Sequence, residues 1–173
     1  MSAVAKPSQK ESPLVGVLVG SKSDLPVAQG CLELLRQFGI PHQVAVVSAH
    51  RTPDLVESTL SELEPTVLAY IVFAGMAAHL AGAVASQTEK PVIGVPVSAS
   101  LNGLDALLSV AQMPPGVPVA AMAVDGAKNA ALFAASVLAL TTAGEKLQLA
   151  RKLAGYRVAQ AEAVAEANRE LNT

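Results

Sequence analysis

Five apolar runs divide this chain into repeating units, and a segment with helical spacing follows each run. We expect strands over residues 14–19, 43–47, 67–73, 91–95 and 117–124. Continuous apolar runs of this length are typical of strands that are buried on both faces of a parallel sheet. Strands that alternate with helices predict an α/β protein, because right-handed crossovers leave few other layouts.

Five parallel strands favour the flavodoxin-like order 2-1-3-4-5, in a three-layer sandwich with helices on both sides of the sheet. We expect these helices over residues 26–38, 53–63, 76–86, 104–111 and 127–140. In this order the topological switch point lies between strands one and three, and ligands bind there at the carboxyl edge of the sheet.

The predicted domain covers residues 14–142, after a polar tail over 1–13 and before a long helical arm over 143–173. The arm has a narrow apolar stripe formed by Leu147, Ala150, Ala154, Val158, Ala161 and Ala165. Such a helix can lie back on its own subunit or pack on a neighbouring subunit. We prefer the neighbour, because half of the chain is hydrophobic (51%) and only 15% is charged.

Composition excludes several classes of partner. The net charge of −2 includes no basic stripe, and the chain has no Trp, two Tyr and three Phe, so a nucleic-acid partner is not expected. The single cysteine, Cys31, rules out an intrachain disulfide. No run approaches the roughly 20 apolar residues that cross a membrane, and no secretion signal is evident, so we expect a cytoplasmic protein.

The first motif that could carry chemistry is Gly-Ser-Lys-Ser-Asp at residues 20–24, directly after the first strand. A glycine turn into a helix start presents backbone N–H groups that favour an anion. Ser21 and Ser23 add hydroxyl groups, and Asp24 adds an acceptor for sugar hydroxyls. The alternative is that Ser23 and Asp24 only cap the helix.

The second motif is Ser-Ala-His-Arg-Thr-Pro at residues 48–53, after the second strand. His50 can give and take a proton near neutral pH, and Arg51 can hold a phosphate or carboxylate through two parallel hydrogen bonds. Two polar, titratable side chains at the end of a buried strand favour a functional site over a packing role.

The third motif is Ala-Gly-Met-Ala-Ala-His-Leu at residues 74–80, after the third strand. Gly75 and its small neighbours allow the backbone to approach a ligand closely. His79 is either a ligand of this site or a core histidine, and spacing alone does not decide. No Asp, Glu, His or Cys cluster has metal-ligand spacing, so we expect no metal.

Together with Gln-Met-Pro-Pro-Gly-Val-Pro at 112–118, these motifs make the chain resemble the N5-carboxyaminoimidazole ribonucleotide mutase family of purine synthesis, from about residue 15 to 140. The resemblance implies a homo-octamer whose sites use more than one subunit, with a ribonucleotide substrate and CO2 and no cofactor. It also implies that the carboxyl group moves from the exocyclic nitrogen to ring carbon C4.

The resemblance further assigns the site residues by position. Ser21, Asp24 and Arg51 would hold the ribose phosphate and neighbouring groups, whereas Ser48, Gly75 and His79 would line the rest of the pocket. His50 would be the acid and then the base: it protonates the carbamate as CO2 leaves, and it removes the C4 proton after CO2 is recaptured.

Two residues depart from the family pattern: Met76 stands where mutases usually have glycine, and Ala81 where they usually have proline. A related branch carboxylates aminoimidazole ribonucleotide with free CO2. That branch typically has lysine in place of Arg51 and lacks the histidine at position 79, so the chain resembles the mutases more.

Functions of other classes remain as alternatives. The fold also suits a flavodoxin-like electron carrier or a ligand-binding module without catalysis. A flavin site would need aromatic residues beside the ring, and the three motifs contain none. A phospho-receiver domain would need an acidic pair after the first strand, which is absent.

Overall fold

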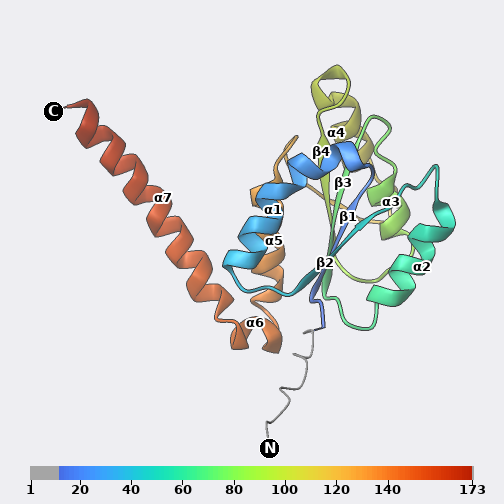
Figure 1. The fold of residues 1–173 in the computed structure, drawn as a ribbon, viewed down its shortest axis with the longest axis horizontal. Coiled ribbons are helices and arrows are strands. Elements are labelled where there is room, and N and C mark those ends of the chain that lie inside the picture. The colour runs from blue at the N-terminus through green and yellow to red at the C-terminus, as the bar shows by residue number, and fades with distance from the viewer. Residues whose placement is uncertain (1–11, 173) are drawn as a thin grey trace, which may run out of the picture.

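Residues 12–172 are described by a computed structural model, in which five parallel strands form one sheet in the order β2-β1-β3-β4-β5 (Figure 1). The strands are β1 (Val15–Val19), β2 (His42–Val46), β3 (Ala69–Gly75), β4 (Val92–Val97) and β5 (Ala120–Ala121). The predicted α/β class and flavodoxin-like strand order are therefore confirmed. The predicted tail lies outside the described residues as far as residue 11.

Helices cover both faces of the sheet. The connections include two 3-10 turns, η1 (Lys22–Asp24) and η2 (Leu101–Gly103), and the helices α1 (Leu25–Gln37), α2 (Pro53–Leu63), α3 (Leu80–Ala85), α4 (Leu104–Ala111) and α5 (Ala127–Leu138). In Figure 1, α1 and α5 lie on one side of the strands and α2 and α3 on the other. This is the expected three-layer sandwich.

The two faces of the sheet contribute to two separate cores. Val15, Val17 and Val19 of β1 pack with α1 and α5, whereas Leu18 faces the core beneath α2, α3 and α4. All four side chains are fully buried, and burial of one such side chain contributes about 1.5–3 kcal/mol. Gly16 is required by packing, because a Cβ there would lie 2.7 Å from the ring of Tyr70.

The last strand is much shorter than predicted. We expected it over 117–124, but only Ala120 and Ala121 pair with β4. Pro118 has no N–H to donate, and proline is confined to strand ends and edges for this reason. Beyond the strand, single backbone bonds from Met122 and Asp125 to β4 continue the edge.

The helix after β3 begins later than predicted. We expected it from residue 76, but α3 begins at Leu80 because the preceding residues form a tight turn. Met76 and Ala78 have φ of 56° and 43°, which is the left-handed region, and a helix cannot pass through it. His79 consequently occupies the N-cap position of α3, at the edge of the sheet.

The C-terminal part contains a short helix α6 (Thr142–Lys146) and a long helix α7 (Leu149–Leu171). Gln148 separates them with a left-handed φ of 54°. The first turns of α7 pack on the domain: Lys152 donates to the Phe38 carbonyl at 2.6 Å, and the rings of Tyr156 and Phe38 meet edge to face.

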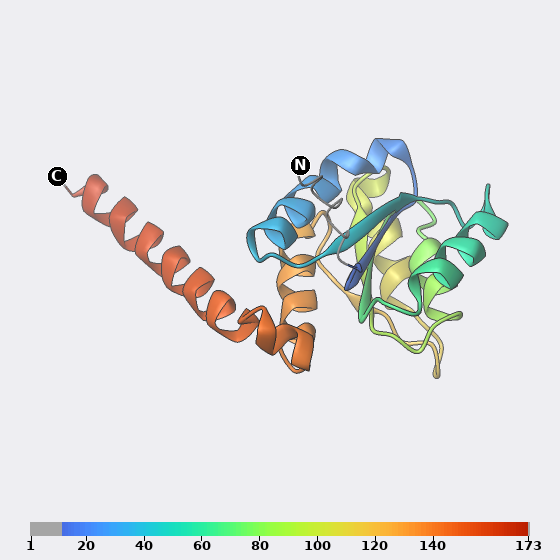
Figure 2. The ribbon, with the colours of Figure 1, turned by 60° about the horizontal axis from the view of Figure 1, so that its bottom comes forward.

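Beyond these turns α7 extends away from the domain, as both views show (Figures 1 and 2). Every side chain from Arg157 to the end of the helix is exposed. The predicted long C-terminal helix is confirmed, and in this single chain it does not lie back on its own domain. Its packing on a neighbouring subunit stays a prediction.

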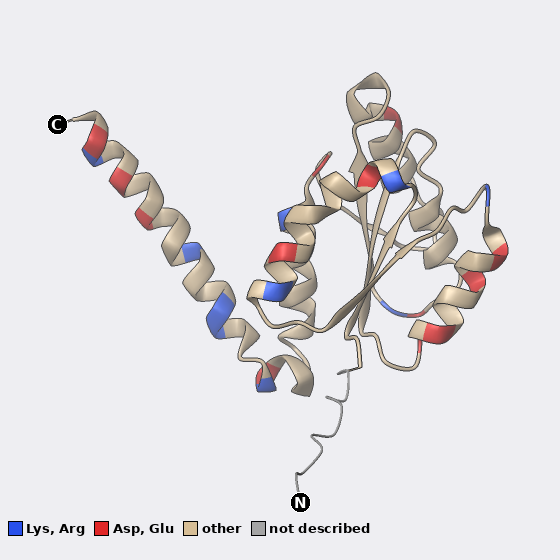
Figure 3. Ribbon diagram, viewed as in Figure 1, with Lys and Arg blue, Asp and Glu red and all other residues tan. Residues whose placement is uncertain are grey.

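Charged residues lie on the helices and loops, with both signs interspersed, and none lies on a strand of the sheet (Figure 3). No helix among residues 12–172 is both long and apolar enough to span a bilayer. Cys31 is fully buried in the core beside α5, and this burial raises the pKa of its thiol to about 12.

Candidate active site at the carboxyl edge of the sheet

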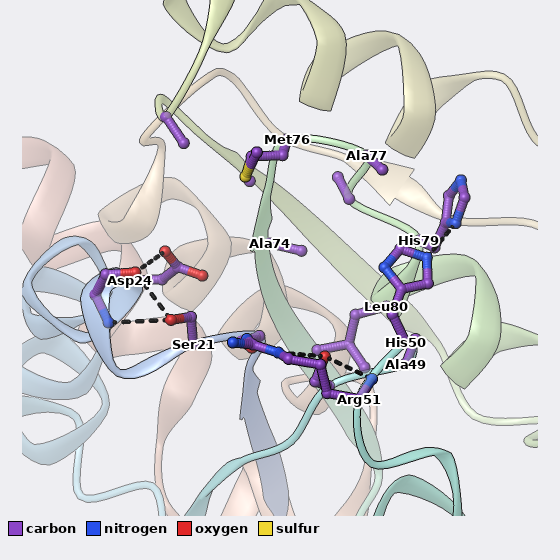
Figure 4. Close-up of a pocket in the computed structure, with 16 residues that line it drawn as sticks. Ser21, Asp24, Ala49, His50, Arg51, Ala74, Met76, Ala77, His79 and Leu80 are labelled. Atoms are coloured by element: carbon purple, nitrogen blue, oxygen red, sulfur yellow. Dashed lines mark hydrogen bonds between the residues drawn. The ribbon is translucent and has the colours of Figure 1, made fainter.

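Three loops meet at the carboxyl edge, where they enclose a cavity of about 410 Å³ (Figure 4). The loops follow β1, β2 and β3, and they are the three motifs that the sequence singles out. All seven predicted site residues line this cavity: Ser21, Asp24, Ser48, His50, Arg51, Gly75 and His79. The predicted convergence of these loops on one rim is therefore observed.

The first loop directs its hydroxyl and carboxyl groups into the cavity. Ser21 caps the turn η1, because its hydroxyl accepts from the Ser23 backbone N–H at 3.3 Å. The Ser23 hydroxyl lies 2.9 Å from that of Ser21 and donates to Asp24 Oδ1 at 3.1 Å. Asp24 stands at the N-cap position of α1 but makes no capping bond with its side chain. Its carboxylate is thus free of a capping role.

Asp24 is a buried carboxyl group in a mostly uncharged wall. Only 8% of the residue is exposed. Burial raises the pKa of this carboxyl above its ordinary value, and the hydrogen bond from Ser23 together with the charge of Arg51 partly offsets the rise. A buried carboxylate of this kind reduces stability near neutral pH, and sites that bind ligands commonly contain such groups.

The second loop is organised around Ser48. The Ser48 backbone N–H donates to the Thr52 hydroxyl at 3.0 Å, and the Ser48 hydroxyl accepts from the backbone N–H and from Nε of Arg51, each at 3.3 Å. Arg51 Nη2 also donates to the Gly20 carbonyl at 3.1 Å. The guanidinium therefore bridges the first two loops and is held in place as a fixed positive charge on the cavity wall.

The two histidines of the motifs are in direct contact. His50 Nε2 lies 2.6 Å from His79 Nδ1, and the ring centroids are 4.7 Å apart with the planes at 77°. Figure 4 shows the two rings together on the side of the cavity opposite Asp24. His50 comes from the loop after β2 and His79 from the turn after β3, so the fold assembles this pair from distant parts of the chain.

The third loop forms the wall between Asp24 and the histidines. Gly75 approaches the next strand so closely that a Cβ would lie 3.0 Å from the Ala99 side chain and 3.1 Å from the Val97 carbonyl. Met76 has a left-handed backbone and a side chain that is 62% exposed at the cavity rim. Its sulfur-bearing side chain lies above Asp24 in Figure 4.

Several lining residues were not among the predicted site residues. Ala99 is the clearest case, since it comes from the loop after β4, which the sequence analysis left out of the site. The rule that ligands bind at carboxyl ends of parallel strands could have found it. The remaining residues lie within two positions of predicted ones: Gly20, Ser23, Ala49, Ala74, Met76, Ala77, Ala78 and Leu80.

This set of groups suits an anionic ligand with hydroxyl groups. Arg51 offers a fixed cation, the serines offer hydroxyls, Asp24 offers an acceptor, and the histidine pair can transfer protons. Within residues 12–172, no three His, Cys, Asp or Glu side chains are grouped as metal ligands would be. The side chains that line the cavity can position a small molecule and move a proton on it.

Fold and site together define a flavodoxin-like α/β protein with a polar cavity, lined by Asp24, Arg51 and two contacting histidines, at the switch point of its sheet. Residues 14–163 match the family model described as AIR carboxylase. The chain belongs to this family.

Named relatives agree with this assignment. The chain is 49% identical over 144 residues to the N5-carboxyaminoimidazole ribonucleotide mutase of Methanocaldococcus jannaschii, covering 83% of this chain and 88% of that protein. It is 50% identical over 147 residues to the mutase of the same name from Thermotoga maritima, covering 84% of each chain. The crystal structure of Treponema denticola PurE aligns with a TM-score of 0.80 at 32% identity, over 93% of this chain and 99% of that one.

Proposed function

We propose that this protein is an N5-carboxyaminoimidazole ribonucleotide mutase of de novo purine biosynthesis, an isomerase that moves a carboxyl group from the exocyclic nitrogen to ring carbon C4. The observation that carries this proposal is the identity of about half of the aligned residues with mutases over most of the chain. The cavity supports it, because it combines an anion-holding arginine with a pair of proton-carrying rings.

The first two loops are proposed to hold the ribose phosphate. Arg51 and the hydroxyl of Ser21 bind the phosphate and its neighbouring groups, and Asp24 accepts hydrogen bonds from sugar hydroxyls. Support comes from the bonds that fix Arg51 between Ser48 and Gly20, because a preorganised guanidinium loses little entropy when it binds an anion.

His50 is proposed to be the acid and base of the reaction. In its protonated form it donates a proton to the exocyclic nitrogen as the N–C bond to the carboxyl group breaks, which leaves CO2 and aminoimidazole ribonucleotide. Ring carbon C4 then attacks the retained CO2, and neutral His50 removes the C4 proton, which restores the aromatic ring. The proton returns to His50, so the cycle needs no outside acid.

Gly75 and the small residues beside it are proposed to let the backbone approach the imidazole ring and CO2. Retention of CO2 beside the ring makes its recapture effectively intramolecular, which favours transfer over loss. Support comes from the close packing of Gly75 against Ala99 and Val97, which leaves no room there for a side chain.

The active protein is proposed to be a homo-octamer in which neighbouring subunits complete the site. Three exposed leucines support this: Leu101, Leu104 and Leu108 of η2 and α4 are 75%, 56% and 51% exposed in the single chain. Large exposed apolar side chains in such a group commonly mark an interface between proteins. The exposed length of α7, which includes Val158 and Val164, is a second such surface.

The experiment that tests the proposed function compares two substrates at equal ribonucleotide concentration. We expect rapid conversion of N5-carboxyaminoimidazole ribonucleotide, and much slower conversion of aminoimidazole ribonucleotide with bicarbonate. Faster turnover of the second mixture would instead assign the protein to the carboxylases that use free CO2. Turnover of neither, together with tight ribonucleotide binding, would favour a non-catalytic binding module.

A further inference from the structure

One wall of the cavity comes from the loop after β4, and two carboxyl groups outside the cavity lining hold this loop. Its lining residue is Ala99, whose side chain would lie 3.0 Å from a Cβ on Gly75. Asp125, from the loop between β5 and α5, accepts a hydrogen bond on Oδ1 from the Ser98 backbone N–H at 3.0 Å. The backbone N–H of Asp125 donates to the Pro96 carbonyl at 2.9 Å. Asp125 therefore fixes the chain directly before Ala99.

The residue on the other side of Ala99 is held by a second carboxyl group. The Ser100 hydroxyl donates to Asp105 Oδ2, and Asp105 belongs to the first turn of α4. The Ser100 carbonyl also accepts from the Gly103 backbone N–H at 2.7 Å. Ala99 consequently lies between two residues that are each bonded to an aspartate from a different part of the fold.

The backbone around these bonds is strained. Leu101 and Asn102 have φ of 44° and 52°, and Asp125 has φ of 56°, all in the left-handed region. Residues other than glycine adopt this region at a cost, and they remain there where surrounding contacts fix the chain. Burial does not compensate for this cost at Leu101, which is 75% exposed. Strained segments are concentrated at functional sites, and this segment adjoins a wall of the cavity.

We propose that Asp125 and Asp105 are positioning residues, which hold Ala99 against Gly75 so that CO2 stays beside the imidazole ring. This inference rests on the proposed function, in which the N–C bond of the carbamate breaks, CO2 forms, and C4 then attacks it. CO2 has no net charge and accepts only weak hydrogen bonds, so the shape of the wall must retain it. A displacement of about 1 Å can slow such an oriented reaction about 100-fold.

The share of CO2 that escapes during turnover separates this role from a purely structural one. Each carbamate molecule consumed gives the C4 carboxylate or, when CO2 escapes, aminoimidazole ribonucleotide. Both are measured at initial rates, and the loss of CO2 without enzyme is subtracted. A variant that only unfolds more readily would lower both rates equally, so the ratio of escaped to transferred CO2 would not change.

Variants at positions 125 and 100 remove the two bonds separately. Asp125→Gly removes the carboxyl group and tolerates the left-handed backbone, whereas Asp125→Asn retains an oxygen that can accept from Ser98. We expect Asp125→Gly to raise the ratio of escaped to transferred CO2 about 3- to 10-fold, and Asp125→Asn to keep it within about twofold of the parent. Ser100→Ala removes the donor to Asp105 and should also raise the ratio. Glu57→Gln, on the exposed face of α2, should leave the ratio unchanged.

An unchanged ratio in both Asp125→Gly and Ser100→Ala would overturn the proposal, and so would an equal rise in Asp125→Gly and Asp125→Asn. A parent protein that converts neither ribonucleotide would overturn the proposed function together with this role. Normal turnover with an unchanged ratio would overturn the role of the aspartates alone.

Hydrogen–deuterium exchange tests the bond from Ser98 to Asp125 without any substrate. Mass spectrometry of a peptide that contains Ser98 measures it on the full-length protein. We expect the Ser98 amide to exchange at least about tenfold faster in Asp125→Gly than in the parent or in Asp125→Asn. Equal exchange in all three proteins would show that the carboxyl group does not hold the loop, which would contradict the proposal.

Discussion

At the scale of single residues, Met76 shows how a site loop can hold an unfavourable backbone. Its φ of 56° lies in the region that glycine adopts freely and other residues adopt at a cost of about 1–2 kcal/mol. Glycine would adopt this backbone conformation without strain. Met76 lies at the rim of the cavity, and strained backbone conformations are common at such functional sites.

We therefore expect Met76→Gly to stabilise the protein. Relief of the left-handed strain should outweigh the greater freedom of glycine in the unfolded chain, with a net gain of about 0.5–1 kcal/mol in the free energy of unfolding. Met76→Ala removes the same side chain but retains the strained backbone, so it should leave stability close to that of the parent. Denaturant unfolding of the parent and the two variants measures the differences in the free energy of unfolding. Equal midpoints for the glycine and alanine variants would show that the backbone at Met76 is not strained.

Asp24 gives a prediction with a defined pH dependence. Because burial raises the pKa of this carboxyl in the folded state, the folded protein binds its proton more tightly than the unfolded chain does. Stability is therefore lost as pH rises through the raised pKa. Asp24→Asn should unfold at a higher temperature than the parent at pH 7, and this advantage should vanish below the ordinary carboxyl pKa of about 4.

The same variant should bind ribonucleotide at least about tenfold more weakly, because hydrogen bonds to charged groups contribute about 1.5–3 kcal/mol. Glu57→Gln, on the exposed face of α2, is the matched surface control and should change neither property. Thermal unfolding at the two pH values and calorimetric titration provide the measurements. A destabilised Asp24→Asn protein at pH 7 would show that the carboxylate supports the fold instead.

Much of the site was predictable residue by residue, because a simple rule places the ends of parallel strands at one edge. That rule predicted that Ser21, His50 and Gly75 lie near one another, although they are far apart in the sequence. It could not predict the contact between the two imidazoles. That bond depends on the left-handed turn at Met76 and Ala78, which delays α3 and turns His79 toward His50, and no local sequence pattern specifies such a turn.

At the scale of elements, the direction of α7 depends on the tight connection from α5 through α6. Gly144 allows this connection, because a Cβ there would lie 1.9 Å from the Leu138 carbonyl oxygen, a backbone atom that cannot move aside. We expect Gly144→Ala to lower the free energy of unfolding by about 1–3 kcal/mol. Gly155, within α7, has nothing within 4 Å of such a Cβ.

Gly155→Ala is the matched control, and it should raise stability by up to about 1 kcal/mol because alanine favours the helix. Denaturant unfolding of both variants gives the comparison. If Gly144→Ala were as stable as the parent, the connection between α5 and α6 would be looser than described. If Gly155→Ala were destabilising, that face of α7 would be packed against another copy of the chain.

Some helices and strands could be predicted from their own residues, whereas others depend on features that a local sequence pattern does not specify. The buried strands β1, β3 and β4 and the helices α2 and α4 follow from apolar runs, periodicity and proline or glycine punctuation, so the sequence predicted them within a few residues. The strand β5 was overestimated, because Pro118 cannot donate to the sheet and because only Ala120 and Ala121 pair with β4. The break at Gln148 was missed, because a left-handed glutamine has no local sequence signal.

At the scale of the whole molecule, the exposed length of α7 carries the prediction of assembly. Val158 lies on the apolar stripe and Gln160 on another face of the same helix, and both are exposed in the single chain. We expect Val158→Lys to reduce the proposed octamer to smaller species, since a charge in an apolar interface is costly. Gln160→Lys should leave the octamer intact.

Light scattering during size-exclusion chromatography measures the mass of the assembly, and division by 17.6 kDa per chain gives the number of subunits. Circular dichroism of the smaller species should retain the helix content of the parent, because position 158 contributes nothing to the core of its own domain. An unchanged mass for Val158→Lys would place the interface elsewhere, with Leu101, Leu104 and Leu108 as the next surface to test.

The proposed acid–base role of His50 is tested most directly by the turnover of the His50→Asn variant. We expect this variant to fold and to bind ribonucleotide as the parent does, while its kcat on N5-carboxyaminoimidazole ribonucleotide falls about 10²- to 10⁴-fold. His42→Asn, outside the cavity, should turn over at the parental rate. Turnover of His50→Asn within a few-fold of the parent would contradict the account.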